Sequence, residues 1–470
     1  MRPLYLGRIQ LRWCDACHVP VLDEVCGRCG GATRAVPVTP PGDARPAFSA
    51  DVALVNRIYD DHFGAPLVPE GTLALMNKVP DPDRMEEVVV GGAVVGHIRY
   101  IPAEDRWEPI PRVEAGALLS PKRRFVVADE GAIPSIRDQG ASLLAPGLRE
   151  IDDEVRAGDE VFILAPDRTV IGVGRARVSA AEARAMGRGA IVRTRRNVSS
   201  PCVPGAATWA DAVAANRPVL DRYEATSAAF VREVVASYPD LPVTVSYSGG
   251  KDSLATLLVV RAALGTVPPL LFADTGFEFP ETYANIDEVA VKYGAEVVRS
   301  SGETAFDATF AEQGPPAVDA RWCCGVCKLA PIGEAIRGRF GQCLSFIGQR
   351  KYESYKRAKS RRVWRNPALP AQLSAAPIHT WTALHVWLYL FREAAPYNPL
   401  YERGLDRIGC YICPSSDLAL LRMIERDYPG PMGAWNERLG AWQREQGLPD
   451  EWVTEGHWRR AGTDGARRGH

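Results

Sequence analysis

The sequence predicts an α/β protein whose C-terminal half is a doubly wound parallel sheet, preceded by a small β-barrel and a cysteine-rich segment. Three observations support this prediction. From about residue 199 onward, short apolar runs suited to buried strands alternate with helical segments. Short strands separated by glycine turns fill residues 122–197. Two Cys-x-x-Cys pairs lie close together near the N-terminus.

Length and composition limit the class of protein. With 470 residues, the chain is long enough for about three domains. A formal net charge of −1 argues against a uniformly basic surface, although it is compatible with a local basic patch. No apolar run reaches the ~18 residues of a membrane span, and the first residues do not form a signal peptide. Eleven cysteines without such a signal indicate metal ligation or redox work, so we expect a cytoplasmic protein with no membrane partner.

The N-terminal cysteines predict a metal site in residues 10–36. Cys14, Cys17, Cys26 and Cys29 supply four thiolates from two knuckles, which suits tetrahedral Zn²⁺. The segment resembles a zinc ribbon. Four unligated thiols would leave a short segment with almost no core, and a closed site has no open position for catalysis. We therefore expect structural zinc, and the sequence leaves open whether the ribbon contacts RNA or acts as a scaffold.

Two predicted modules follow. A helical period in residues 50–62 precedes β-like runs at 87–90 and 94–101, which predicts a small α+β module over residues 45–118. No function follows from this module.

The β-rich segment, residues 119–198, resembles a PUA domain. The stretches 140–147, 157–161 and 171–176 carry the resemblance, which implies binding of structured RNA such as tRNA or rRNA. Arginines of the segment are candidates for phosphate contacts: Arg123, Arg124, Arg149, Arg175, Arg177, Arg193, Arg195 and Arg196. The alternative is a barrel with solvated arginines, since acidic residues such as 152–154 lie in the same segment.

A candidate anion site begins the catalytic half. An apolar run leads into the string Ser-Gly-Gly-Lys-Asp-Ser and then into a second apolar run, which reads as strand, turn and helix. Gly249 and Gly250 allow the backbone to approach a ligand closely, and N–H groups at the helix start favour an anion. Lys251 adds a charge, while Ser248 and Ser253 add hydroxyl donors. The spacing is not that of a Walker A motif.

This string resembles the PP-loop of the adenine nucleotide alpha hydrolase superfamily, in which the loop grips the pyrophosphate or sulfate end of a nucleotide. An ordinary strand-to-helix turn is the alternative. Asp252 would take part in catalysis, with Mg²⁺ as a further candidate cofactor, or would act only as a charge at the helix N-terminus.

Further motifs follow two later strands. An apolar run at 270–273 leads into Asp274 and Gly276, and a third strand end at 346–350 precedes Ser354 and Arg357. Ligands of open α/β sheets bind at the carboxyl ends of strands, where these motifs lie.

Residues 199–470 resemble the phosphoadenosine phosphosulfate (PAPS) reductase family, which includes adenylyl sulfate (APS) reductases. The match covers roughly residues 240–415 and implies a PP-loop fold that binds ATP or a sulfonucleotide. The implied nucleotide-binding residues are Ser248, Gly249, Gly250, Lys251, Asp252, Ser253, Asp274, Gly276, Arg350, Ser354 and Arg357, and the catalytic ones are Lys251, Asp252, Asp274 and Arg350.

Structural roles remain open for several of these side chains and their neighbours. Asp274 and Glu278 would otherwise be solvated loop carboxylates, and the arginines would be surface charges. Trp381 and Trp387 are expected in the core rather than against a ligand.

The late cysteines predict a second metal site. Cys323, Cys324, Cys410 and Cys413 resemble the [4Fe–4S] arrangement of cluster-containing APS reductases, with a lysine nearby as in that family. Cys327 offers an alternative set with Cys324 and the later pair, which would also suit zinc.

Two differences from the PAPS reductase family argue against a reductase activity. Reductases of the family attack sulfate sulfur with a cysteine near the C-terminus, whereas no cysteine follows Cys413 here. The complete loop string is closer to superfamily members that cleave ATP to AMP and pyrophosphate. We therefore expect ATP-dependent sulfur transfer to RNA, with tRNA, an adenine nucleotide and a sulfur donor or reductant protein as partners. Sulfite release from APS or PAPS, with Cys327 or a partner thiol as nucleophile, and a non-catalytic RNA-binding sensor are the alternatives.

Overall fold

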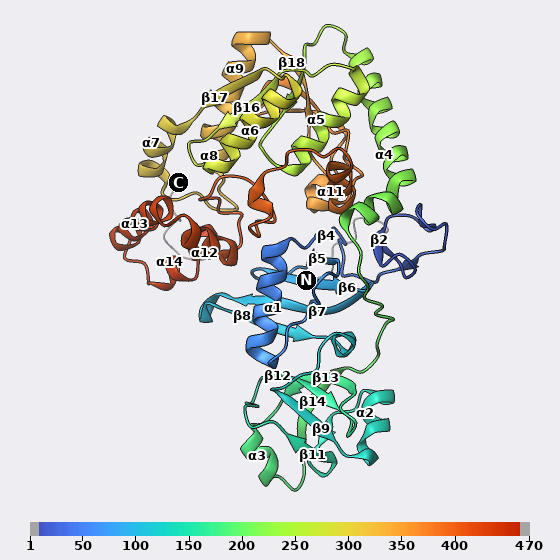
Figure 1. Ribbon diagram of the computed structural model, residues 1–470. Coiled ribbons are helices and arrows are strands. Elements are labelled where there is room, and N and C mark those ends of the chain that lie inside the picture. The colour runs from blue at the N-terminus through green and yellow to red at the C-terminus, as the bar shows by residue number, and fades with distance from the viewer. Residues whose placement is uncertain (1–8, 461–470) are drawn as a thin grey trace. The chain divides into compact units, whose positions relative to one another are not determined.

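The computed structural model describes residues 9–460 and divides the chain into two compact units (Figure 1). The first unit contains the chain up to Ile101 and residues 105–217. The second contains residues 102–104 and the chain from Pro218 onward. Across residues 9–460, no helix combines the length and the apolar character that a membrane crossing requires.

The cysteine-rich segment of the first unit folds on a three-stranded antiparallel sheet. Its order is β2 (Val19–Val21), β1 (Arg12–Cys14) and β3 (Arg34–Ala35). Trp13 is almost completely buried and lies against Gly92. Cys14 pairs with Val19 across β1 and β2, so Cys17 lies in the turn between these two strands.

A five-stranded antiparallel sheet with one helix follows. The strands are β4 (Arg45–Pro46), β5 (Ala74–Lys78), β6 (Met85–Val90), β7 (Ala93–Ile101) and β8 (Arg106–Pro111). Helix α1 (Ser49–Phe63) buries Val55, Tyr59 and Phe63, which are spaced four residues apart and therefore share one face. The predicted helix and both predicted β runs are present.

A six-stranded sheet forms the β-rich segment. Its order is β10 (Leu143–Leu144), β14 (Ala190–Arg196), β13 (Val170–Ala176), β12 (Glu160–Leu164), β9 (Phe125–Ala128) and β11 (Leu148–Ile151). Strand β9 runs parallel to β12, and the other pairs are antiparallel. Phe162 of β12 meets Phe63 of α1 with ring centroids 4.7 Å apart, so this sheet and the α+β module share one apolar core.

The second unit is built on a six-stranded, mostly parallel sheet. Its order is β17 (Val297–Ser301), β16 (Leu270–Asp274), β15 (Val243–Ser246), β18 (Cys343–Ile347), β20 (Leu369–Ala375) and β19 (Val363–Asn366), the last being an antiparallel edge. The chain goes from β15 to β16 and β17 on one side, then returns to β18 on the other. The order therefore reverses between β15 and β18, and ligands of such sheets bind at this switch point.

Helices cover both faces of this sheet (Figure 1). They include α4 (Trp209–Ser237), α5 (Lys251–Leu264), α6 (Pro280–Tyr293), α9 (Ala330–Phe340) and α11 (Ala383–Arg392). Helix α5 is buried from Leu254 to Val260 because its sequence there is apolar on every side except at Thr256. This burial fixes the start of α5 directly after β15.

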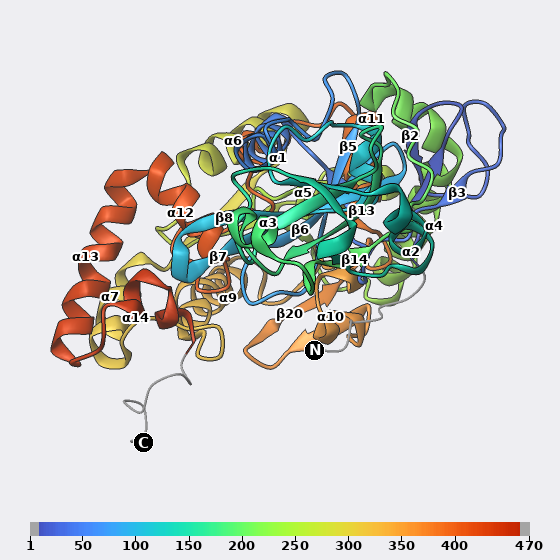
Figure 2. The same cartoon turned by 90° about the horizontal axis from the view of Figure 1, so that it is seen from below.

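The last part of the second unit is helical. Figures 1 and 2 both show α12 (Leu418–Asp427), α13 (Pro429–Glu445) and α14 (Glu451–Thr454) close to α7 (Glu303–Gln313). An apolar cluster joins Phe306 of α7 to Trp435 and Trp458, and it also includes Cys327. These helices therefore pack against the segment that carries the first group of late cysteines.

Candidate functional site

The glycine turn after β15 is shaped by close contacts that exclude larger residues. Gly249 has a φ of +72°, and a Cβ there would lie 2.8 Å from Cγ2 of Thr282. Gly348, just after β18, lies so close to the start of α5 that its Cβ would be 2.5 Å from the backbone of Asp252. The segments that follow β15 and β18 therefore come into close contact at the switch point, which requires glycine at these positions because a side chain would clash.

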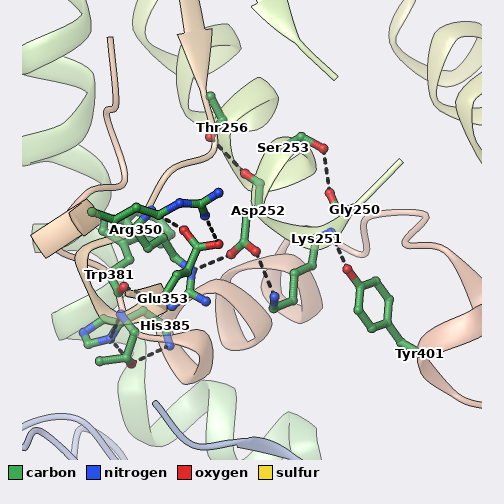
Figure 3. A network of polar contacts seen from close by, with 12 residues as sticks. Gly250, Lys251, Asp252, Ser253, Thr256, Arg350, Glu353, Trp381, His385 and Tyr401 are labelled. Atoms are coloured by element: carbon green, nitrogen blue, oxygen red, sulfur yellow. Dashed lines mark hydrogen bonds and ion pairs between the residues drawn. The ribbon is translucent and has the colours of Figure 1, made fainter. Parts of the chain in front are cut away.

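Lys251, Asp252 and Arg350 form a buried network at this point (Figure 3). The Lys251 ammonium lies 2.8 Å from Oδ2 of Asp252, and Nε of Arg350 donates to Oδ1 at 2.6 Å. Burial opposes the charge of Asp252, but Arg350 and Lys251 outweigh it and hold the pKa of this carboxyl below its usual value. The carboxylate is thus ionised at neutral pH and shared by two cations.

Tyr401 completes the loop region. Its hydroxyl accepts a 3.0 Å hydrogen bond from the backbone N–H of Lys251, and its ring centroid lies 5.8 Å from the Lys251 ammonium. Ser253 donates to the carbonyl of Gly250 at 2.8 Å. The tyrosine oxygen therefore contacts the first turn of α5. The N–H groups of a first helical turn are a common binding site for anions. The sequence interpretation gave Tyr401 no role.

Replacing Asp252 by alanine is expected to lower the free energy of unfolding by about 3–5 kcal/mol, because Lys251 and Arg350 would remain buried without their shared counter-ion. Urea unfolding followed by tryptophan fluorescence measures the change. The control is Asp287→Ala, since the Asp287 side chain is 71% exposed and its loss should cost within about 0.5 kcal/mol. Equal stability of the two variants would contradict the structural role of the network.

Asp274 is held in place at the end of β16. Its Oδ1 accepts from the Tyr283 hydroxyl at 2.7 Å and from the N–H of Gly276 at 3.0 Å. Burial and this contact raise the pKa of Tyr283 above its usual value. Asp274 is therefore a positioned, partly buried acceptor. The role of Tyr283 was missing from the sequence interpretation.

Ser354 and Arg357 lie outside the Lys251–Asp252–Arg350 network. Ser354 caps the short helix α10 (Tyr355–Ala358) by accepting from the N–H of Arg357 at 3.3 Å. The Arg357 guanidinium is exposed and forms an ion pair with Glu353. Both residues thus have local partners, and their predicted contact with a nucleotide remains a prediction. Trp381 and Trp387 are fully buried, as expected for core residues.

The four N-terminal cysteines converge. The Sγ atoms of Cys14, Cys17, Cys26 and Cys29 all lie within 4.8 Å of one another. Cys14 and Cys29 are 3.5 Å apart, and Cys17 and Cys26 are 3.9 Å apart. Four sulfurs about 2.3 Å from a central ion would have about this separation. This cluster can therefore hold a metal ion, and its closed, all-sulfur donor set fits zinc.

We expect Cys17→Ser to abolish stoichiometric zinc at this cluster, because three thiolates remain where a structural site needs four ligands. Zinc content by mass spectrometry of metals and amide hydrogen exchange in residues 10–36 measure the effect. Cys202→Ser is the control, since the Cys202 thiol lies 3.5 Å from the carbonyl of Val90 and outside the cluster. Unchanged zinc in the Cys17 variant would contradict the assignment.

The late cysteines come from two distant segments. Cys323 and Cys324 end α8 (Trp322–Cys324), which continues into a π-helical stretch, Gly325–Leu329. Such irregular turns are frequent at functional sites. The two segments lie close enough for their charges to interact. A hydrogen bond with Cys324 and burial raise the pKa of Cys323, with smaller effects from Cys410 and Cys413.

Polar groups surround these sulfurs. Arg321 donates to Sγ of Cys324 at 3.4 Å, and Arg407 approaches Sγ of Cys413 at 3.9 Å. The Thr275 hydroxyl lies 3.3 Å from Sγ of Cys410. Lys328 lies 3.7 Å from Glu278, which makes Glu278 a buried ion-pair partner rather than a solvated loop carboxylate.

These groups favour the thiolate form of Cys324. The hydrogen bond from Cys323, followed by the charges of Arg321 and Lys328, lowers the pKa of Cys324 to about 5 against the opposing effect of burial. Donors aimed at the sulfurs would offset the negative charge of a metal–thiolate group, which makes an iron–sulfur cluster a candidate occupant of this group of cysteines.

Cys327 is more deeply buried than the other late cysteines. It is 2% exposed and belongs to the apolar cluster of the C-terminal helices. Burial, followed by the charge of Cys324, raises the pKa of Cys327 to about 11. The hydrogen bond with Cys324 and burial also raise the pKa of Cys323, so these shifts do not separate the two ligand sets. The choice between Cys323 and Cys327 as a ligand remains a prediction.

Comparison with known families identifies both domains. The phosphoadenosine phosphosulfate reductase domain matches residues 242–416, and the PUA domain matches residues 124–198. The chain therefore belongs to the PAPS reductase family of the PP-loop superfamily and carries a PUA domain in addition.

Relatives of this chain fall into two groups. It is 36% identical to an uncharacterized protein of Methanocaldococcus jannaschii over 97% of both chains. It is 34% identical to an adenosine 5′-phosphosulfate reductase of Bacillus pumilus, covering 31% of this chain and 61% of that enzyme. It is 32% identical to a sulfate adenylyltransferase subunit 2 of Alkalilimnicola ehrlichii, covering 42% of this chain and 70% of that subunit. The first relative therefore matches across both domains, and the enzymes match one part.

Two solved structures are similar to parts of the chain. The PAPS reductase of Candida auris covers 41% of this chain and 93% of its own, with a TM-score of 0.32 and 20% identity. A conserved PUA domain protein of Thermoplasma acidophilum covers 34% of this chain and 97% of its own, with a TM-score of 0.28 and 23% identity.

Proposed function

We propose that the protein is an RNA-directed sulfurtransferase that activates a base oxygen with ATP. The target carbonyl oxygen attacks the α-phosphorus, an O–P bond forms, and pyrophosphate leaves. A hydrosulfide-level sulfur species then forms a C–S bond at the same carbon, and AMP leaves with the oxygen. The sequence is redox-neutral, so ATP and a sulfur donor are its only co-reactants.

The buried Lys251–Asp252–Arg350 network at the switch point is the observation that carries this proposal. The Lys251 ammonium would stabilise the negative charge that develops on the phosphates, with the N–H groups of the first turn of α5. Asp252 holds both cations in position through its two oxygens. The Tyr401 hydroxyl accepts a hydrogen bond from the backbone N–H of Lys251. When a nucleotide binds, a phosphate oxygen would replace the hydroxyl as the acceptor of this N–H.

An iron–sulfur cluster bound at the late cysteines would hold the sulfur species for transfer. Cys323, Cys324, Cys410 and Cys413 would be its ligands. Arg321, Arg407 and Lys328 would offset the negative charge of the ligated group.

RNA binding is proposed for the PUA domain on the basis of its family and its exposed cations. Arg149, Arg177 and Arg193 are exposed and form no ion pair with any residue in 9–460. Arg124 and Arg195 instead pair with Asp159 and Glu160. The first three are therefore free to contact phosphates, whereas the last two serve the fold.

The second candidate is sulfonucleotide reduction, which similarity to an adenosine 5′-phosphosulfate reductase favours. Against it, residues 418–460 form packed helices without a cysteine, and Cys327 is buried. A non-catalytic RNA-binding sensor is the third.

One set of assays with anaerobically purified protein separates the three. Pyrophosphate release from ATP that rises on addition of unfractionated tRNA is the expected result. Sulfite formed from APS or PAPS with a thiol donor would instead identify a reductase. Nucleotide binding without turnover would leave only the sensor.

A further inference from the structure

We propose that an exposed surface just after Arg350 binds single-stranded RNA next to the nucleotide site. This inference rests on the proposed RNA-directed function and names a second RNA contact outside the PUA domain. The surface, called here the basic surface, consists of Tyr355, Lys356, Lys359, Arg361 and Arg365. Tyr355 and Lys356 lie on α10, and Arg365 lies on the edge strand β19. Lys359 and Arg361 lie in the segment between these two elements, close to the labels α10 and β20 in Figure 2.

The segment has a strong excess of positive charge. Residues 351–365 contain seven lysines and arginines and one acidic residue, Glu353. The chain as a whole has a formal net charge of −1, so this local excess is not a consequence of composition. Clustered cations on one surface are typical of contacts to nucleic-acid phosphates.

Some of these cations already have structural roles. Arg362 lies over the Phe230 ring with its Cζ 3.7 Å from the centroid, and it donates to the carbonyl of Pro377 at 3.0 Å. Arg357 pairs with Glu353. These two arginines anchor the segment and are left out of the basic surface.

Lys351 is half-buried, with its ammonium 5.0 Å from the centroid of the Tyr352 ring. The remaining four cations face solvent without acidic partners. Lys356, Lys359 and Arg361 are exposed and form no ion pair within residues 9–460. Arg365 on β19 is also exposed, and its guanidinium donates only to the carbonyl of Pro370, at 3.0 Å, among the described contacts. Strand β19 is held against β20 by antiparallel pairing, which fixes this part of the surface.

An exposed aromatic ring lies among these charges. Tyr355 is 52% exposed, and the Lys359 ammonium lies 4.0 Å from the centroid of its ring. Proteins that bind single strands combine cations along the backbone with aromatic rings on which bases stack. A tyrosine exposed among cations therefore fits an unpaired nucleotide better than a regular duplex.

The position of the surface connects it to the chemistry. Tyr355 follows Arg350 by five positions, so their Cα atoms lie within about 18 Å. Nε of Arg350 is 2.6 Å from Asp252 in the loop network. A strand bound on the basic surface would thus present a neighbouring unpaired base toward the activated phosphate.

The first test reverses two charges. Lys356→Glu combined with Arg361→Glu is compared with Arg232→Glu combined with Arg337→Glu, a matched control at exposed arginines on α4 and α9. Filter binding of unfractionated tRNA is measured across a salt series. We expect at least a tenfold loss of affinity only in the first variant, and a log–log salt dependence flatter by about 1.4, as for two lost single-strand phosphate contacts.

The second test separates stacking from charge. Tyr355→Ala is expected to weaken tRNA binding by about 5- to 150-fold, corresponding to 1–3 kcal/mol per stacked base. Tyr355→Phe keeps the ring and should retain wild-type affinity. ATP affinity, measured by equilibrium dialysis, should change less than about twofold in every variant.

Three outcomes would overturn the inference. If the charge-reversed variant keeps wild-type tRNA affinity, the basic surface is not an RNA contact, although the protein still binds RNA. Lost ATP affinity with unchanged tRNA affinity would assign the surface to the free nucleotide. Absence of tRNA binding by the wild-type protein would remove both this inference and the RNA-directed function on which it rests.

Discussion

Lys251→Ala is expected to reduce RNA-stimulated pyrophosphate release by about 100- to 1,000-fold. Removing one preorganised donor to a developing oxyanion costs roughly this much in other enzymes. The effect should fall mainly on kcat, because the charge on the phosphates grows in the transition state. Initial rates of pyrophosphate release at several ATP concentrations, with saturating tRNA, separate kcat from KM.

The fold should survive this change, since Asp252 keeps its 2.6 Å contact with Arg350. Lys292→Ala is the matched control, because Lys292 lies on α6 and its exposed ammonium donates only to the carbonyl of Ala394 among the described contacts. A decrease of less than tenfold in the Lys251 variant, with unchanged secondary structure by circular dichroism, would contradict the role assigned to the loop.

Cys410→Ser is expected to remove the iron–sulfur cluster almost completely. Anaerobically purified wild-type protein should contain about four iron and four sulfide ions per chain if four thiolates hold a [4Fe–4S] cluster. Cys410 is held near Thr275 and Glu278, so its thiolate cannot be replaced by a neighbouring cysteine without a change in the turn. Iron and acid-labile sulfide analysis, together with electron paramagnetic resonance after reduction, measure the loss.

Cys327→Ala is the discriminating control. Because Cys327 is buried in the apolar cluster, its replacement should leave iron and sulfide unchanged while costing some stability. Equal cluster loss in the Cys327 and Cys410 variants, with Cys323→Ser unaffected, would identify the alternative ligand set. Zinc without sulfide in the wild-type protein would replace the cluster by a zinc site.

Local features of the site could be predicted from the sequence because they depend on neighbours along the chain. The turn at Gly249 and Gly250, between apolar runs, needs only its own residues to form. The strand at 270–274 and the helix at 251–264 follow from apolar patterning in the same way. The knuckle spacing of Cys14 and Cys17 likewise encodes its own geometry.

Contacts between distant segments could not be predicted in this way. Asp252 and Arg350 are 98 positions apart, and Lys251 and Tyr401 are 150 apart. No periodicity in either segment identifies the other as its partner. The same limit applies to Arg321 and Arg407, whose side chains approach the cysteines only after the second unit has folded.

The shared apolar core of the first unit limits how its parts can be separated. Phe63 of α1 and Phe162 of β12 are both fully buried, and each covers the other. A fragment cut near residue 119 would leave an aromatic ring of each half in water and would tend to aggregate. Any recombination that moves the PUA domain to another protein must therefore carry the helix and its sheet along as one inherited piece.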